Sequence, residues 1–391
     1  MVRRTSSRLE PFTRSPMNII DSLLVNSPPG LIRLHAGEPS LPPPLQLAND
    51  LLDELRRPEA YAYAPNLGIH ELREAISEDL KRYGASVAPE EVAVTPSGSA
   101  AIYAVLSAIV DPGDEVVLLD PTFMLYRPVL EYLGVRVRWL RASLSDGFQP
   151  SVDLLSEAVT DKTKAVVIVD PDNPTGRLLS DEARRALAEL AEDRGFYLLV
   201  DEAYRSIVYE GAYRSPYNFA PDSVVGLGSF SKDPGVPGLR VGYVYGPSDV
   251  IKAYSMLSAH AYFGASNASQ LYVLKYLRWE EREAFIRQVV DEYRRRRDAA
   301  VSAAREFMPQ ARFIVPQGAM YLYVDVSYAV TDSEGFALKL VRDYRVSVMP
   351  GTAFGPSGNG FIRITFVSQP PDRLREGIRR IGLALAGLGS E

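Results

Sequence analysis

The side chains best suited to chemistry stand where the apolar runs of this sequence end. Asn173 comes shortly after one run, Asp201 directly ends the next, and Lys232 follows a third. A turn at Ser97-Gly98 opens a predicted helix. Because ligands in an open parallel sheet bind beyond the carboxyl ends of the strands, we expect these residues to lie together at one sheet edge.

A lysine, a carboxylate, an amide, hydroxyls and an arginine at one edge suit a phosphorylated carbonyl cofactor. Pyridoxal phosphate needs a lysine amine for a Schiff base and a carboxylate beside its pyridine nitrogen, so that the ring acts as an electron sink. Its phosphate needs backbone donors at a helix start, hydroxyls and an arginine. The sequence lacks the motifs of nucleotide-binding proteins. No phosphate-binding loop is present, and Gly226-Leu227-Gly228 lacks the third glycine of a dinucleotide fingerprint. The inventory favours pyridoxal phosphate.

The elements that must position these residues alternate along the chain. Apolar strands that alternate with amphipathic helices predict an α/β sheet, mostly parallel and covered on both faces. Strands are predicted at 115–119, 135–140, 164–169, 196–200, 224–229 and 240–245, with helices at 46–57, 68–83, 98–110, 123–133 and 180–193.

Four motifs occur in an order that resembles the signature series of a known family, the class I/II aminotransferases, which are fold type I pyridoxal-phosphate enzymes. The motifs are Asn173-Pro174-Thr175-Gly176, Asp201-Glu202-Ala203-Tyr204, Ser229-Phe230-Ser231-Lys232 and Gly238-Leu239-Arg240-Val241-Gly242-Tyr243. The resemblance runs from Gly37 to Arg363 and covers most of the chain. Each motif alone is weak, whereas the ordered set is specific.

The resemblance implies a role at the cofactor for each matched residue. Lys232 would form the Schiff base and act as the proton-transfer base, with a pKa lowered by burial and by the charge of Arg240. Asp201 would pair with the pyridine nitrogen, and Tyr204 and Asn173 would donate to the phenolic oxygen. The remaining cofactor contacts would be the ring-stacking Phe123 and, at the phosphate, Ser97, Gly98, Ser99, Ser229 and Arg240, with Ser231 a weaker candidate.

Other matched residues concern the substrate and a second subunit. Arg363 matches an arginine that clamps the substrate α-carboxylate, and Gly37 would lie near the same group, where a missing Cβ allows close approach. Asn173 is also assigned to the substrate. Tyr63 matches a tyrosine that reaches the phosphate of the neighbouring subunit, so the resemblance implies a homodimer with shared active sites. Tyr61 is the alternative to Tyr63.

Beyond Gly264 the pattern indicates a second, smaller α+β domain. It predicts helices at 265–280, 281–306, 333–344 and 371–387, and strands at 311–314, 319–325 and 361–365. Since Gly37 and Arg363 lie outside the central motif series, this domain is expected to be discontinuous. We therefore predict a three-layer α/β/α large domain over 46–276 and a small domain from 1–45, including an N-terminal arm, and 277–391.

The composition excludes several other classes of protein. No cysteine is present, which excludes disulfide frameworks, thiolate metal sites and thiol nucleophiles. The three histidines lack metal-binding spacing, so no metal is expected. A net charge of −6 disfavours nucleic acid as a partner. No run approaches about 18 apolar residues and the N-terminus lacks a secretory pattern, so we expect a cytoplasmic protein that does not bind membranes.

The leading hypothesis is an aminotransferase that moves an amino group between an L-amino acid and a 2-oxo acid by a ping-pong mechanism. A pyridoxal-phosphate lyase, decarboxylase or synthase would share most of these residues, and a non-catalytic ligand sensor could keep the fold. The substrate stays open, since no second arginine for a dicarboxylic acid can be placed. Four aromatic residues near the family's side-chain pocket hint at an apolar or aromatic substrate: Tyr262, Phe263, Tyr321 and Tyr323.

Overall fold

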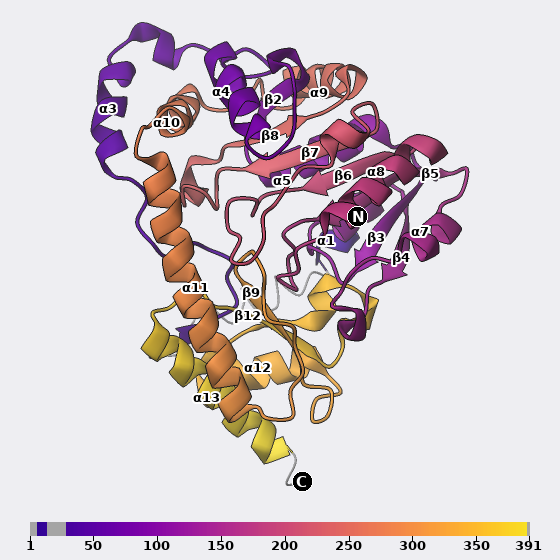
Figure 1. Ribbon diagram of the computed structural model, residues 1–391, viewed down its shortest axis with the longest axis vertical. Coiled ribbons are helices and arrows are strands. Elements are labelled where there is room, and N and C mark those ends of the chain that lie inside the picture. The colour runs from indigo at the N-terminus through magenta and orange to yellow at the C-terminus, as the bar shows by residue number, and fades with distance from the viewer. Residues whose placement is uncertain (1–5, 14–28, 389–391) are drawn as a thin grey trace, which may run out of the picture.

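A seven-stranded sheet forms the centre of the larger part of the molecule (Figure 1). The computed structural model describes residues 6–13 and 29–388. Across the sheet the order is β2 (Val92–Thr95), β8 (Gly242–Tyr245), β7 (Val224–Ser229), β6 (Tyr197–Asp201), β5 (Thr163–Val169), β3 (Glu115–Asp120) and β4 (Arg136–Arg141). From β7 to β4 all neighbours run parallel, and β8 is antiparallel to both of its neighbours. The predicted α/β class with a mostly parallel sheet is confirmed.

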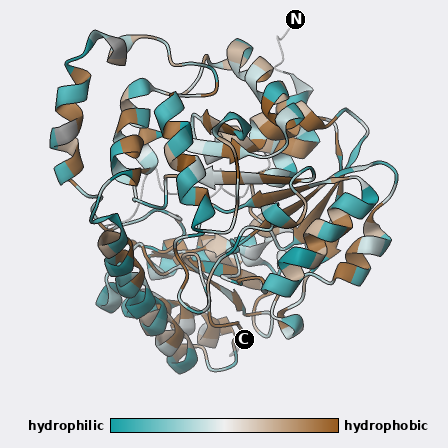
Figure 2. Cartoon of the chain, turned by 45° about the horizontal axis from the view of Figure 1, so that its top comes forward, coloured by the Kyte–Doolittle hydropathy of each residue, from teal (hydrophilic) through white to brown (hydrophobic). Residues whose placement is uncertain are grey.

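Helices cover both faces of this sheet, which gives the predicted three layers. Alternate residues of each strand point to opposite faces; on β6, Leu198 and Val200 join one apolar cluster and Leu199 joins the other. Figure 2 shows mostly brown strands surrounded by helices that carry teal. One face is covered by α4 (His70–Lys81), α7 (Val152–Ala158), α8 (Asp181–Arg194) and α10 (Asn267–Leu277), and the other by α5 (Gly98–Ile109), α6 (Tyr126–Tyr132) and α9 (Ser248–Ala261).

A second core lies below the large sheet in Figure 1 and uses both ends of the described chain. Its elements are α11 (Arg282–Phe307), β9 (Tyr321–Asp325), α12 (Ser333–Tyr344), β11 (Met349–Pro350), β12 (Phe361–Thr365) and α13 (Pro371–Leu388), with β1 (Ile32–Arg33) paired in parallel to β10 (Val346–Ser347). Ile32 and Leu34 belong to this core. The division of the chain at 45/46 and 276/277 stays a prediction.

Two short helices pack at the margins of the large part. α3 (Gln46–Leu55) lies against α10, where Leu47 contacts the cluster that holds Tyr272 and Tyr276. α1 (Glu10–Thr13) lies against α6 through the rings of Phe12 and Tyr132. The predicted N-terminal arm falls partly on residues 1–5 and 14–28, which lie outside the described residues.

The structure differs from the predicted elements in a few places. The predicted strand at 311–314 is wrong, because this segment makes only an isolated bridge from Arg312 to Asp325 and is followed by Pro316, which has no backbone N–H to pair. The elements that the sequence did not predict include β2, α7 and α9 as well as the short elements α1, β1, β10 and β11. β2 has only four residues and is closed by Pro96, which is too short a pattern to separate from a turn.

Candidate active site

The predicted site residues meet where the parallel strands end. Asp201 is the last residue of β6, while Asn173 and Lys232 follow β5 and β7. The Lys232 Nζ donates a hydrogen bond of 2.5 Å to the carbonyl oxygen of Gly37, and it lies 6.0 Å from the ring centroid of Tyr204. Residues that are far apart in the sequence therefore surround one amine.

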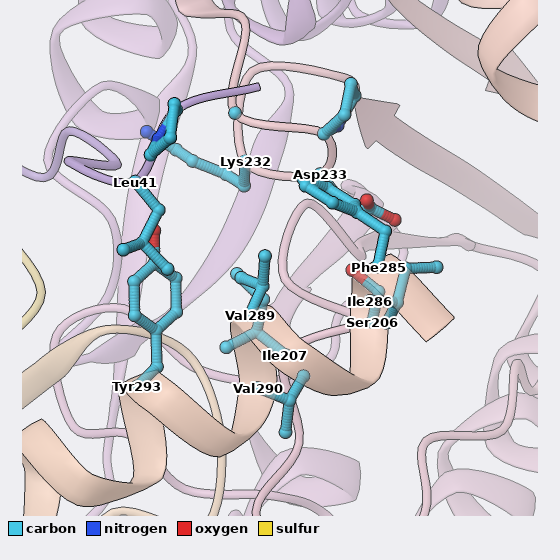
Figure 3. A pocket seen from close by; sticks show the side chains of 13 residues that line it. Leu41, Ser206, Ile207, Lys232, Asp233, Phe285, Ile286, Val289, Val290 and Tyr293 are labelled. Carbon is cyan, nitrogen blue, oxygen red and sulfur yellow. The ribbon is translucent and has the colours of Figure 1, made fainter. Parts of the chain in front are cut away.

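Burial lowers the pKa of Lys232 to about 8. Beneath its side chain lies an apolar pocket lined by Leu41, Ile207 and Val289, and the lysine extends above it toward Leu41 (Figure 3). The charge of Arg363 lowers the pKa further. Arg240, the neighbouring charge predicted from the sequence, is exposed and has the smallest of the effects on this pKa. An amine with this pKa is partly neutral near neutral pH, as a nucleophile or base must be.

Asp201 is a buried carboxylate aimed into the same space. It accepts hydrogen bonds from the Tyr126 hydroxyl at 2.9 Å and from the Ala203 N–H at 3.2 Å. Burial raises its pKa to about 6, while Lys232 acts in the opposite direction. A cation placed beside it would lower this pKa and be stabilised in turn. Sequence reasoning missed Tyr126, because a tyrosine inside an amphipathic helix pattern carries no signal of its partner.

A chain of hydrogen bonds links Tyr204 to Arg363. The Asn173 amide nitrogen lies 3.4 Å from the Tyr204 hydroxyl, and the amide oxygen accepts a bond of 2.8 Å from Arg363. The Tyr321 hydroxyl lies 2.7 Å from that of Tyr204. Tyr204, Asn173 and Arg363 were predicted from sequence, whereas Tyr321 was placed only near a side-chain pocket.

Arg363 is buried and fixed by its neighbours. It is 3% exposed, donates a bond of 2.6 Å to the His35 carbonyl oxygen, and lies over the rings of Tyr321 and Phe354 at 4.2 and 4.8 Å. Its buried Nε has no hydrogen-bond partner in the described part of the chain. Such a donor is costly unless a ligand satisfies it, and a carboxylate accepts two parallel bonds from a guanidinium.

Gly37 is required by its neighbour Tyr321. A Cβ at position 37 would lie 2.1 Å from the Tyr321 hydroxyl oxygen. The absence of a side chain therefore admits the tyrosine, in addition to any substrate carboxylate. The contact with Tyr321 adds a second reason for glycine here, beside the approach of a substrate carboxylate that the sequence predicts.

The predicted phosphate residues lie around the start of α5. Ser97 is the N-cap of this helix, with a φ of 115° and an Oγ that accepts from the Ala100 N–H at 3.1 Å. Gly98 packs against Ser229, since a Cβ on the glycine would lie 3.1 Å from the Ser229 Cβ. The unpaired N–H groups and dipole of a helix start favour an anion.

The outer phosphate candidates are exposed in the single chain. Ser99 and Arg240 are exposed, and Arg240 donates a bond of 2.8 Å to the Pro237 carbonyl oxygen. Ser231, by contrast, is buried, and its N–H donates to the Ser229 Oγ at 3.2 Å. Phe123 is partly buried and meets Tyr126 edge-on at 6.3 Å between ring centroids.

Five of the aromatic residues named from the sequence make no recorded contact with Lys232 among the described residues: Tyr61, Tyr63, Tyr262, Phe263 and Tyr323. Tyr63 is 88% exposed and Tyr61 78% exposed. Phe263 contacts Tyr63, with 5.8 Å between ring centroids, and Tyr262 donates to the Tyr254 hydroxyl. Tyr323 is buried against Phe361 and its hydroxyl lies 3.5 Å from the Gly351 carbonyl oxygen. Tyr321 lies over Arg363 and contacts Tyr204, and Tyr323 is paired with Arg363 in the sheet.

Buried ion pairs connect Glu202, which follows Asp201, to Asp233, which follows Lys232. Arg205 donates to Glu202 at 2.7 Å and to Asp79 at 2.5 Å, and Arg282 donates to Asp79 at 2.5 Å. Arg282, the first residue of α11, also lies 3.8 Å from Asp233. Glu202 accepts further bonds from three buried hydroxyls, those of Tyr213, Tyr243 and Tyr245. This network therefore joins the residues next to Asp201 and Lys232 through buried ion pairs and hydrogen bonds.

The donor set fits pyridoxal phosphate. Lys232 offers an amine of lowered pKa, Asp201 a buried carboxylate, and Tyr204 a phenol, while the start of α5 suits a phosphate. The described residues contain no group of acidic or histidine side chains that could hold a metal ion. No helix within 6–13 and 29–388 is long and apolar enough to cross a membrane.

Comparison with known proteins decides the family. The family model described as aminotransferase class I and II matches residues 29–381. The chain belongs to the class I and II aminotransferases. It is 34% identical over 357 residues to an aspartate/prephenate aminotransferase of Thermus thermophilus, with 91% of each chain covered. It is 31% identical over 363 residues to an arginine–pyruvate transaminase of Pseudomonas aeruginosa, covering 92% of this chain and 91% of the other.

Solved structures agree with this assignment. An aspartate aminotransferase variant of Thermus thermophilus superposes with a TM-score of 0.91 at 32% identity and covers 98% of this chain and 100% of its own. The aspartate aminotransferase of Thermotoga maritima gives 0.89 at 30% identity, with 98% and 100% covered. The protein is therefore a fold type I aminotransferase that depends on pyridoxal phosphate, as the sequence predicted.

Proposed function

We propose that this aminotransferase carries the cofactor on Lys232, with its pyridine nitrogen at Asp201 and its phenolic oxygen at Tyr204 and Asn173. The observation that supports this most is the position of the Lys232 amine, which has a pKa of about 8 and lies above Tyr204. The proposal assigns the phosphate to Ser97, Gly98, Ser99, Ser229 and Arg240, and the ring face to Phe123.

Different side chains bind the substrate and transfer its proton. Arg363 binds the α-carboxylate, and Asn173 keeps the guanidinium oriented through its 2.8 Å bond. The cofactor, when bound, supplies an electrophilic carbon and an electron sink. Lys232 Nζ, in its neutral form, takes the proton from the substrate Cα. Amino donor and 2-oxo acid acceptor use the same site in turn, which is a ping-pong cycle.

A half-reaction tests this assignment. Protein loaded with pyridoxal phosphate is expected to lose its visible absorption when one amino acid is added alone, and to regain it when a 2-oxo acid follows. A panel should include aspartate, arginine and aromatic amino acids, since relatives named for aspartate, prephenate and arginine substrates all match. Release of ammonia or carbon dioxide without an acceptor would instead indicate a lyase or decarboxylase.

The proposal includes a homodimer with shared sites. Tyr61, Tyr63, Met256 and Phe263 are exposed by 78%, 88%, 65% and 58%, although all are apolar or aromatic. Covering such side chains with a second copy would remove apolar surface from water. In that dimer Tyr63 would reach the phosphate of the partner's site. We place the enzyme in the cytoplasm, where amino acids and 2-oxo acids are available; cell fractionation would test that location.

Hybrid dimers test the shared site. Tyr63→Ala and Lys232→Ala homodimers are each expected to be strongly impaired. In a hybrid of the two, the Tyr63→Ala chain keeps Lys232 and receives Tyr63 from its partner, so one of the two sites is complete. Mixing and refolding the variants should restore about a quarter of wild-type activity, because half of the dimers are hybrids. The same experiment with Tyr61→Ala distinguishes the two tyrosines. Absence of any recovery would contradict the exchange.

A further inference from the structure

We propose that Tyr321 is a positioning residue, which donates its hydroxyl hydrogen to Tyr204 and thereby directs the Tyr204 hydrogen toward the cofactor's phenolic oxygen. This inference rests on the proposed function of Tyr204. Tyr321 lies at the first position of β9, in the second core, and reaches across to the loop that follows β6.

The number of hydrogens on the two phenols fixes the direction of the bond. A tyrosine hydroxyl has one hydrogen and can accept others. Tyr204 already receives the Asn173 amide at 3.4 Å, and its only hydrogen can serve either Tyr321 or the cofactor. If Tyr204 donates to the cofactor, the 2.7 Å contact requires Tyr321 to be the donor. A phenol that accepts such a bond becomes a stronger donor itself.

The surroundings of Tyr321 allow it little other freedom. Its ring lies 4.2 Å from the Arg363 guanidinium carbon and meets the Tyr204 ring edge-on at 5.7 Å. The hydroxyl occupies the space where a Cβ at position 37 would lie. In the described part of the chain, Tyr204 is the hydrogen-bond partner recorded for this hydroxyl. A buried side chain whose hydroxyl has this one partner is suited to orienting that partner.

The charged and titratable groups around this pair are few. Burial raises the pKa of both phenols, so both keep their hydrogens at neutral pH. The charge of Arg363 lowers the pKa of both tyrosines, whereas the charge of Asp201 raises it. Lys232 lies above the Tyr204 ring. None of these groups contacts the Tyr321 oxygen as closely as Tyr204 does.

Replacing Tyr321 by phenylalanine tests the proposal with the smallest change. The ring stays over Arg363 while the donor disappears. Negative charge on the phenolic oxygen then loses stabilisation, so the pKa of the lysine-bound cofactor, read from its absorption spectrum against pH, is expected to rise by roughly half a unit or more. KM for the amino acid should change little, because the Arg363 clamp is kept.

Tyr209→Phe is the matched control. Tyr209 is also buried and donates to the Ala319 carbonyl oxygen at 2.6 Å without contacting the site. Removing the Tyr209 hydroxyl should lower the stability of the protein as Tyr321→Phe does, but it should leave the pKa of the lysine-bound cofactor unchanged. An unchanged or lowered cofactor pKa in Tyr321→Phe would overturn the proposal, since it would mean that Tyr204 donates to Tyr321. A wild-type protein without the visible band would instead refute the proposed function.

Discussion

Replacing Lys232 by alanine is expected to abolish the visible absorption of the bound cofactor and to lower the transamination rate by at least about 10⁴-fold. The variant removes the only amine that the structure brings to Tyr204 and Asp201 among the described residues, and with it both the covalent link and the base. Absorption spectra and single-turnover rates measure the two losses separately. Lys252→Ala, which changes an exposed lysine of α9, should behave as wild type.

The pKa of Lys232 gives this prediction a pH dependence. Only the neutral amine attacks the cofactor's aldehyde, and burial has lowered its pKa to about 8. Capture of pyridoxal phosphate by the cofactor-free protein should therefore accelerate about tenfold per pH unit below pH 8 and level off above it. An ordinary exposed lysine would keep accelerating to about pH 10. A profile without a bend near pH 8 would contradict the assigned environment.

Replacing Arg205 by methionine is expected to lower the free energy of unfolding by about 3–5 kcal/mol. Arg205 is 8% exposed and joins Glu202 to Asp79, so its loss leaves two buried carboxylates without their shared cation. Methionine keeps most of the volume, which separates the charge effect from a cavity. Chemical denaturation of the cofactor-free protein, followed by fluorescence or circular dichroism, measures the change.

A matched exposed pair provides the control for Arg205. Arg375 binds both oxygens of Glu306 at 2.7 Å, but each side chain is 48% exposed. Because solvent screens such a pair, Arg375→Met should cost no more than about 1 kcal/mol. A similar loss of unfolding free energy at both positions would show that the buried network around Arg205 stabilises the protein no more than an exposed ion pair does. Glu202→Gln added to Arg205→Met should recover part of the loss by removing one uncompensated charge.

Sequence patterns were sufficient for the sheet and for the residues at its edge. Asn173, Asp201 and Lys232 each follow an apolar run, and parallel strands must end at one edge, so local periodicity already implied that these side chains converge. Strand β2 escaped detection, because four residues give too little periodicity. The resemblance added roles for Tyr204, Arg240 and Arg363, since those depend on motif order along the chain.

The sequence by itself thus determined which fold and which chemistry this chain supports. Tertiary structure alone decided which groups tune that chemistry. The bond from Tyr321 to Tyr204, the bond from Tyr126 to Asp201 and the charge of Arg363 on Lys232 join residues that no shared motif or helical repeat connects. Such contacts arise where separate elements pack, and burial then gives them their strength by excluding water. That strength cannot be read from residue spacing.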